Sequence, residues 1–127
     1  MTPTLLRRRP AWRTAVLLLA LVLFLAPPLL AETPFDGHWE GAIDLPTGQL
    51  EIDVDLESDA AGTLSGDITI PVQSIRDRPL GGFEADGEAL IFTIPGIPGD
   101  PTFDGELSAD GDVLSGTFRQ GGGQLSF

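Results

Sequence analysis

The sequence contains no cysteine, no lysine and a single histidine, His38. Without cysteine the fold cannot use disulfides, so it must rest on hydrogen-bonded structure and core packing. One histidine and no cysteine also exclude the usual structural zinc sites. A serine-histidine-acid triad would have to use His38, yet neither Ser65 nor Ser115 lies in a Gly-x-Ser-x-Gly motif. The sequence therefore predicts a non-enzymatic protein, and it singles out no catalytic, cofactor-binding or metal-binding residue.

Charge is divided between two parts of the chain. Arg7, Arg8, Arg9 and Arg13 precede Ala31, and all 19 acidic residues follow it. Beyond Ala31 only three arginines oppose those acids, so this part carries a net charge of 3 − 19 = −16. Such a surface repels nucleic acid and anionic lipid, and we expect neither as a partner of this part.

The first 31 residues have the order of a secretory signal peptide. A basic segment is followed by an apolar run at 15–26, and the small residue Ala31 ends the segment. We expect cleavage after Ala31, with Ala26 as a second choice, and a periplasmic or extracellular product. The alternative is an uncleaved membrane anchor. The run at 15–26 is shorter than the ~20 residues that span a bilayer, and Pro27 and Pro28 would break a longer helix.

Residues 32–127 are predicted to form one domain of strands and turns. From Leu50 to Glu57 apolar and acidic residues alternate, which is typical of an antiparallel strand with one buried face. Motifs rich in proline, aspartate and glycine at 45–48, 58–62, 85–87 and 109–111 indicate turns. The strands predicted between them are 39–44, 49–57, 63–70, 82–84, 89–94, 102–108, 113–120 and 124–127.

Seven to nine short strands without helical periodicity predict an all-β domain. We expect either a small antiparallel β-barrel of the lipocalin-like kind or a sandwich, preceded by a signal-peptide helix. Trp39 and the strand phenylalanines are predicted to form its core. A barrel would also enclose a small apolar ligand, which is a second function that the sequence leaves open.

Two acidic patterns resemble cation sites. In the stripe from Glu51 to Glu57, successive same-face carboxylates lie ~7 Å apart, too far for all of them to hold one ion. The runs at 104–106 and 110–112 combine aspartate with glycine, which is first of all a turn signal. We therefore interpret the stripe as a solvated strand face, and the two runs as parts of a hairpin with its turn at 109–111 and not as calcium sites.

Four segments resemble a known family. They occur at 37–41 (GHWEG), 70–75 (IPVQSI), 95–105 (PGIPGDPTFDG) and 115–122 (SGTFRQGG). Together they look like the N-terminal β domain that precedes the catalytic domain in some secreted bacterial α/β-hydrolases of the serine-aminopeptidase-like group. The resemblance implies a non-catalytic, barrel-like domain. Trp39, the turn prolines and the glycines are its structural residues, and the serine nucleophile of the family lies in a downstream domain.

Three functions follow from these observations. The first is an exported accessory domain that binds another protein, a hydrolase domain or a second copy of the chain through a sheet edge. The second is a barrel that binds an apolar ligand. The third is a fragment of a longer secreted serine hydrolase. None of them implies a cofactor.

Overall fold

Antiparallel strands make up nearly all the regular structure of residues 4–8 and 33–127, which the computed structural model describes. Within these two ranges there is no α-helix, and a short 3-10 turn, η2 (Pro71–Gln73), is the one helical element. The all-β class is therefore confirmed. In the part of the chain described, no helix is long and apolar enough to cross a membrane. The predicted signal-peptide helix and the cleavage site at Ala31 lie outside the described residues.

In the described residues, ten strands form one sheet. They are β1 (Leu6–Arg8), β2 (Gly37–Leu45), β3 (Gly48–Ser58), β4 (Leu64–Ile70), β5 (Ile75–Pro79), β6 (Gly81–Asp86), β7 (Ala89–Thr93), β8 (Thr102–Leu107), β9 (Val113–Gln120) and β10 (Gly123–Ser126).

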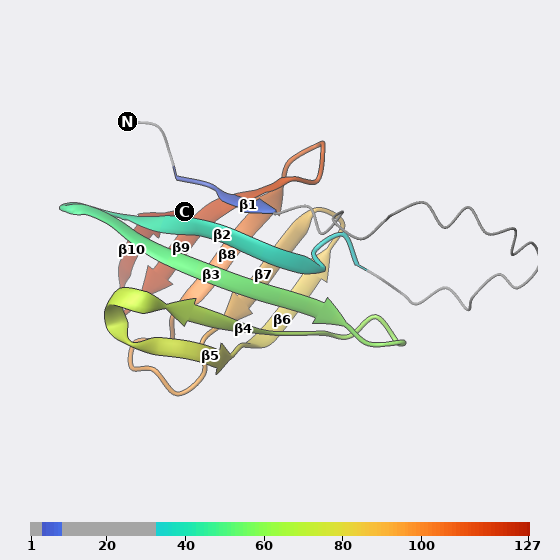
Figure 1. Cartoon of the computed structure of the whole chain (residues 1–127), viewed down its shortest axis with the longest axis horizontal. Coiled ribbons are helices and arrows are strands. Elements are labelled where there is room, and N and C mark those ends of the chain that lie inside the picture. Colours follow the sequence, from blue (N-terminus) through green and yellow to red (C-terminus); the bar gives the residue numbers. More distant parts are fainter. Residues whose placement is uncertain (1–3, 9–32) are drawn as a thin grey trace, which may run out of the picture.

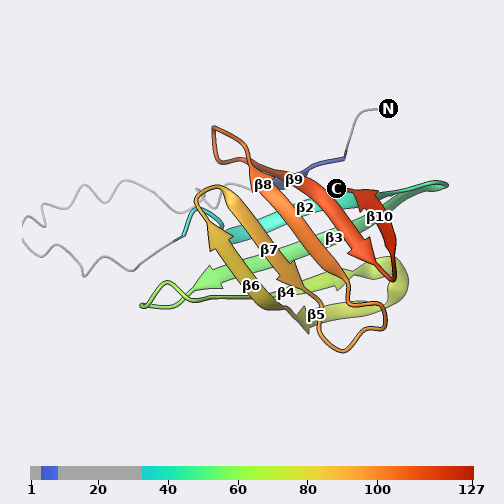
Figure 2. The same ribbon diagram turned by 180° about the vertical axis from the view of Figure 1, so that it is seen from behind.

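The sheet folds over itself into two facing layers, with the core between them. Its strand order is β5-β4-β3-β2-β1-β9-β8-β7-β6, and β10 pairs with β9. Strands β2 to β5 form one layer in Figure 1, and β6 to β9 form the other, seen from its own side in Figure 2. The end strands β5 and β6 are not paired with each other, so the sheet is open. They are joined at Leu80, whose N–H donates to the carbonyl of Gly66 at 2.9 Å.

The predicted strands and hairpins are confirmed, but two strands were not predicted. The turn at 45–48 connects β2 and β3, and Gly87 and Gly111 have the positive φ angles expected of the Asp-Gly turns. The unpredicted strands are β1 and β5, and with them the described ranges contain ten strands rather than the seven to nine expected. β5 is short and charged, and Asp77 interrupts its alternation with a φ of 45°.

The core is built on Trp39 and a series of phenylalanine rings, as predicted. Trp39, Phe92 and Phe103 are fully buried. The rings of Phe92 and Phe103 stack with centroids 4.8 Å apart, and Phe127 meets Phe103 edge-on at 5.2 Å. Aromatic pairs in these arrangements stabilise a core beyond the burial of their apolar area. These rings serve the core and not an exposed ligand platform.

A short turn before β2 closes the core beside Trp39. The indole N–H of Trp39 donates to the carbonyl of the buried Phe35 at 2.9 Å. Asp36 holds this turn in place, because one carboxylate oxygen accepts from the hydroxyl of Thr33 and the other from the hydroxyl of Ser58, both at 2.6 Å. Partial burial raises the pKa of Asp36, but these hydrogen bonds outweigh it and lower the pKa below its usual value.

Candidate functional site

The outer face of the β2–β3 hairpin brings one histidine together with three carboxylates. His38 lies opposite Asp55 in the register, and Glu40 lies opposite Asp53. His38 Nδ1 is 2.6 Å from a carboxylate oxygen of Asp55. His38 Nε2 is 3.4 Å from an oxygen of Glu40 and 3.8 Å from one of Asp53. The only histidine of the chain is therefore surrounded by negative charge.

These carboxylates raise the pKa of His38. The hydrogen bond to Asp55 is the largest cause, and together with the attraction of Asp55, Glu40 and Asp53 it outweighs the opposing effect of partial burial. On the next strand, the pKa of Asp67 is also raised, by partial burial and by repulsion from neighbouring carboxylates, Asp55 first. The face is thus a charged surface on which one imidazolium offsets part of the repulsion.

We expect His38 to stabilise the domain more at mildly acidic pH than at alkaline pH. Its pKa is higher in the folded state than the unfolded value of about 6.5, so the stabilisation is fully present below pH 6.5. It is lost as the pH rises through the folded-state pKa. NMR titration of the single histidine gives that pKa directly. Unfolding by denaturant between pH 6 and 9, in the native chain and in His38→Gln, isolates the contribution to stability. A folded-state pKa at or below 6.5 would contradict this expectation.

The same cluster has the outline of a cation site. Ligand atoms of His38, Glu40 and Asp53 lie within 4.8 Å of one another, and they are the one such group in residues 4–8 and 33–127. All three side chains are more than a third exposed. The imidazole nitrogen that would bind a cation already faces the two carboxylates. We therefore assign the cluster to charge balance on the sheet surface.

The register of the hairpin explains why sequence reasoning missed this cluster. Spacing along a single strand relates only the carboxylates of that strand, and it leaves His38 as a residue at the entry of the first strand, beside Trp39. His38 does lie near the start of β2. Once Leu45 pairs with Gly48, however, counting outward along both strands places His38 opposite Asp55. The turn motif at 45–48 was the signal from which the cluster could have been found.

The two runs that resemble calcium-binding patterns form a turn and an ion pair. Asp110 accepts from the hydroxyl of Ser108 at 2.5 Å and from the N–H of Asp112 at 3.0 Å, and these bonds lower the pKa of Asp110. Asp104 lies 3.4 Å from the guanidinium of Arg119 on the neighbouring strand. The turn predicted at 109–111 is confirmed.

A second candidate surface is the seam where β1 enters the sheet between β2 and β9. Its register places Arg8 beside Trp39 on one side and Leu6 beside Leu114 on the other. The N–H of Arg8 also donates to the carbonyl of Asp112 at 2.9 Å. On this side of the molecule, β1 provides the strand through which the two layers are joined.

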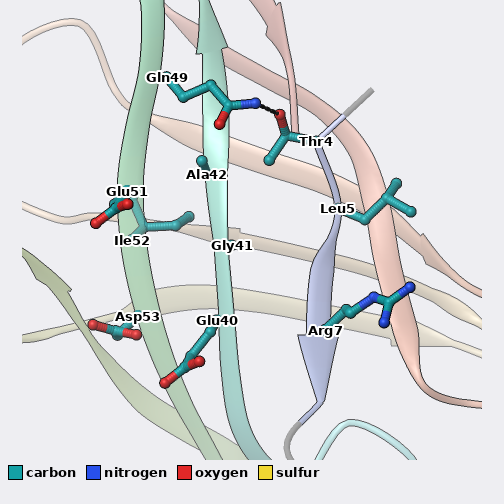
Figure 3. Close-up of a pocket in the computed structure, with 10 residues that line it drawn as sticks. All are labelled: Thr4, Leu5, Arg7, Glu40, Gly41, Ala42, Gln49, Glu51, Ile52 and Asp53. Atoms are coloured by element: carbon teal, nitrogen blue, oxygen red, sulfur yellow. Dashed lines mark hydrogen bonds between the residues drawn. The ribbon is translucent and has the colours of Figure 1, made fainter. Parts of the chain in front are cut away.

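Side chains of β1 alternate between the core and the surface. Leu6 is fully buried and belongs to the core. The guanidinium carbon of Arg8 lies 4.9 Å from the ring centre of Trp39, within reach of a cation–π interaction. Nε and Nη2 of Arg8 are buried and have no hydrogen-bond partner among residues 4–8 and 33–127. Arg7, between them, is exposed and extends away from β2 in Figure 3.

A groove of about 550 Å³ runs along the outside of this seam, between β1 and the β2–β3 hairpin (Figure 3). Thr4 lies at one end, where its N–H and hydroxyl both bond to the carboxylate of Asp44 and its hydroxyl accepts from Gln49. These bonds, those from Thr4 first, lower the pKa of Asp44. Glu40 and Glu51 line the groove with negative charge.

An apolar cavity of about 160 Å³ lies at one end of the core. Ile43, Ile70 and Phe118 contribute to its walls, and Gln73 and Gln120 contribute polar atoms. Pockets for small-molecule ligands usually measure about 300–1,000 Å³. The cavity is smaller than that range, so it gives little support to a ligand-binding barrel.

No relative helps to interpret the His38 cluster or the seam at β1. Comparison of the chain with protein-family models, with curated proteins and with solved structures finds no match. The resemblance to the β domain of secreted hydrolases therefore stays a prediction, and function must be argued from the residues of the chain itself.

Proposed function

We propose that this chain is an exported, non-enzymatic β domain that acts by binding another protein along its sheet. One observation carries the proposal. β1 completes the sheet between β2 and β9, yet it belongs to the 31 residues that have the pattern of a signal peptide. Removing residues 1–31 therefore takes a strand out of the sheet.

An empty strand position between β2 and β9 would expose unpaired backbone groups. Backbone N–H and C=O groups of β2 and β9 that face β1 would lose their partners, and unpaired edge groups are the template on which extended segments of other proteins add. Leu6 would leave a gap in the core at the same place. The processed domain is thus expected to gain stability by accepting a strand from a partner. A secreted hydrolase domain is the partner that the family resemblance suggests.

The proposal is tested by expressing the full chain with a C-terminal tag in a bacterium. We expect the tagged protein in the exported fraction, with the mass of a chain whose first residue is Glu32. We also expect it to show no turnover of chromogenic esters or peptides. Leu18→Arg with Leu19→Arg interrupts the apolar run and should keep the protein in the cytoplasm unprocessed. An exported protein that retains Arg7 and Arg8 would contradict the processing step, and ester or peptide turnover would contradict the non-enzymatic assignment.

A further inference from the structure

We propose that the strand position between β2 and β9 is a binding site for an extended basic segment of another chain, with an apolar residue followed two positions later by arginine. This inference rests on the proposed function, because processing is what vacates the position. Leu6, Arg7 and Arg8 occupy it in the structure and show which side chains it accepts.

Strand β2 allows the backbone of an incoming strand to approach closely. A Cβ atom at Gly41 would lie 2.7 Å from the carbonyl oxygen of Leu5 and 2.9 Å from the Cα of Leu6. Any side chain at Gly41 would therefore collide with the incoming strand. At Gly37, a Cβ would still be 3.9 Å from the side chain of Arg8, so the site is tightest where the apolar residue enters.

The first side-chain position is apolar. Leu6 is completely buried and forms part of the same core as Trp39 and Leu114. An incoming strand that places a charge there would have to bury it without a partner, which is strongly unfavourable. This position gives the site its selectivity for an apolar residue.

The second side-chain position accepts a cation. Arg8 lies over the face of Trp39, where the ring attracts positive charge. Two of its nitrogens are nevertheless buried with no acceptor in the part of the chain that the structure describes, and buried unpaired groups lower stability. β1 is also only three residues long. β1 is therefore held only weakly in the sheet, and an extended segment of another chain with the same apolar and basic side chains can displace it.

Charge favours a basic partner. Residues 32–127 carry a net charge of −16, and Glu40, Glu51 and Asp53 line the groove beside the seam. Complementary charge of this kind steers association and rejects acidic segments. The alternating pattern and the charge together define the partner as an extended peptide with the order apolar, any residue, arginine.

The experiment uses the full chain, with a single protease site replacing residues 18–24. The folded chain is nicked at this site and then mixed with a fluorescently labelled peptide of residues 2–9 (TPTLLRRR). Anisotropy reports whether the peptide replaces the internal strand. Three variant peptides test the assignment: Leu6→Glu, Arg8→Ala and Arg7→Ala. Because the substitutions are in the peptide, they cannot unfold the acceptor.

We expect saturable binding of the native peptide. Leu6→Glu should weaken it about tenfold or more, since it loses the burial of a leucine. Arg8→Ala should weaken it about three- to tenfold through the contact with Trp39. Arg7→Ala removes the same charge from the exposed face, and it should bind within about twofold of the native peptide. As a matched test of the acceptor, Gly41→Val in the nicked chain should abolish binding.

Absence of binding to the nicked chain would overturn the proposal. Equal losses for Arg7→Ala and Arg8→Ala, with no effect of Leu6→Glu, would also overturn it, because the attraction would then depend on charge alone. Since the assay uses purified protein, its failure says nothing about export. Conversely, failure of processing in cells would contradict the proposed function while leaving the measured affinity of the site intact.

Discussion

Replacing Trp39 with alanine should lower the free energy of unfolding by about 3–5 kcal/mol, the usual cost of truncating a buried tryptophan. The ring is fully buried, and its N–H bonds to the carbonyl of Phe35 at 2.9 Å. Truncation would leave a cavity, an unpaired carbonyl and no ring for Arg8 to contact. Because the total free energy of unfolding of a small domain is about 5–15 kcal/mol, this loss is a large share of the stability.

The effect of Trp39→Ala is measured by urea unfolding followed by circular dichroism. Trp39→Phe is the matched control, since it keeps an aromatic ring and loses the N–H bond. Its cost should be clearly smaller. An unchanged midpoint for Trp39→Ala would show that the ring contributes little to the core, and would favour the ligand-platform interpretation that the buried position argues against.

Phe127→Ala should have a comparable effect, about 3–5 kcal/mol. Phe127 is 1% exposed, and its ring meets Phe103 edge-on. Its backbone N–H and C=O both pair with Gly116 of β9, and the substitution leaves these bonds in place. The loss therefore reports the ring alone. The Phe127 ring also packs closely against β8, because a Cβ at Gly105 would lie 2.9 Å from the Cζ atom of the ring.

Leu125→Ala is the control for Phe127→Ala, because Leu125 lies on β10 and is only partly buried. It should cost distinctly less. Thermal and denaturant unfolding of the two variants gives the comparison. Equal, small losses in both would mean that the chain from 123 onward is loosely attached, contrary to the burial of Phe127.

The parts of the fold that sequence predicts best are those fixed by neighbouring residues. The alternation from Leu50 to Glu57 determines β3, and Pro46 and Gly48 fix the turn that precedes it. Asp-Gly pairs supply the positive φ of two further hairpins. In each case the signal lies within about ten residues of the element it predicts, so no distant partner has to be known.

What could not be predicted depends on distant contacts. Leu6 and Arg8 have no local strand signal, and their basic surroundings are typical of a signal peptide. Only pairing with β2 and β9 makes them a strand. The same holds for the Leu-Ser-Gly segments at 64–66 and 114–116. Their glycines are explained only by strand pairing, because a Cβ at Gly66 or Gly116 would lie 2.2 Å or 2.0 Å from a carbonyl oxygen of the preceding strand.

The position of β1 also imposes an order in time on synthesis. Leu6 pairs with Leu114, 114 − 6 = 108 residues later in the chain. At the usual rate of about 5–20 residues per second, this interval lasts about 5–20 seconds on the ribosome. During that time β9 is incomplete and β1 cannot pair with it, so a targeting factor could bind the N-terminal segment if that segment is the signal peptide we propose. Once Leu114 has emerged and β9 has formed, folding competes with targeting for the same residues. Under the export that we propose, the rate at which the targeting factor binds then decides whether Leu6 and Arg8 direct export or become part of the sheet.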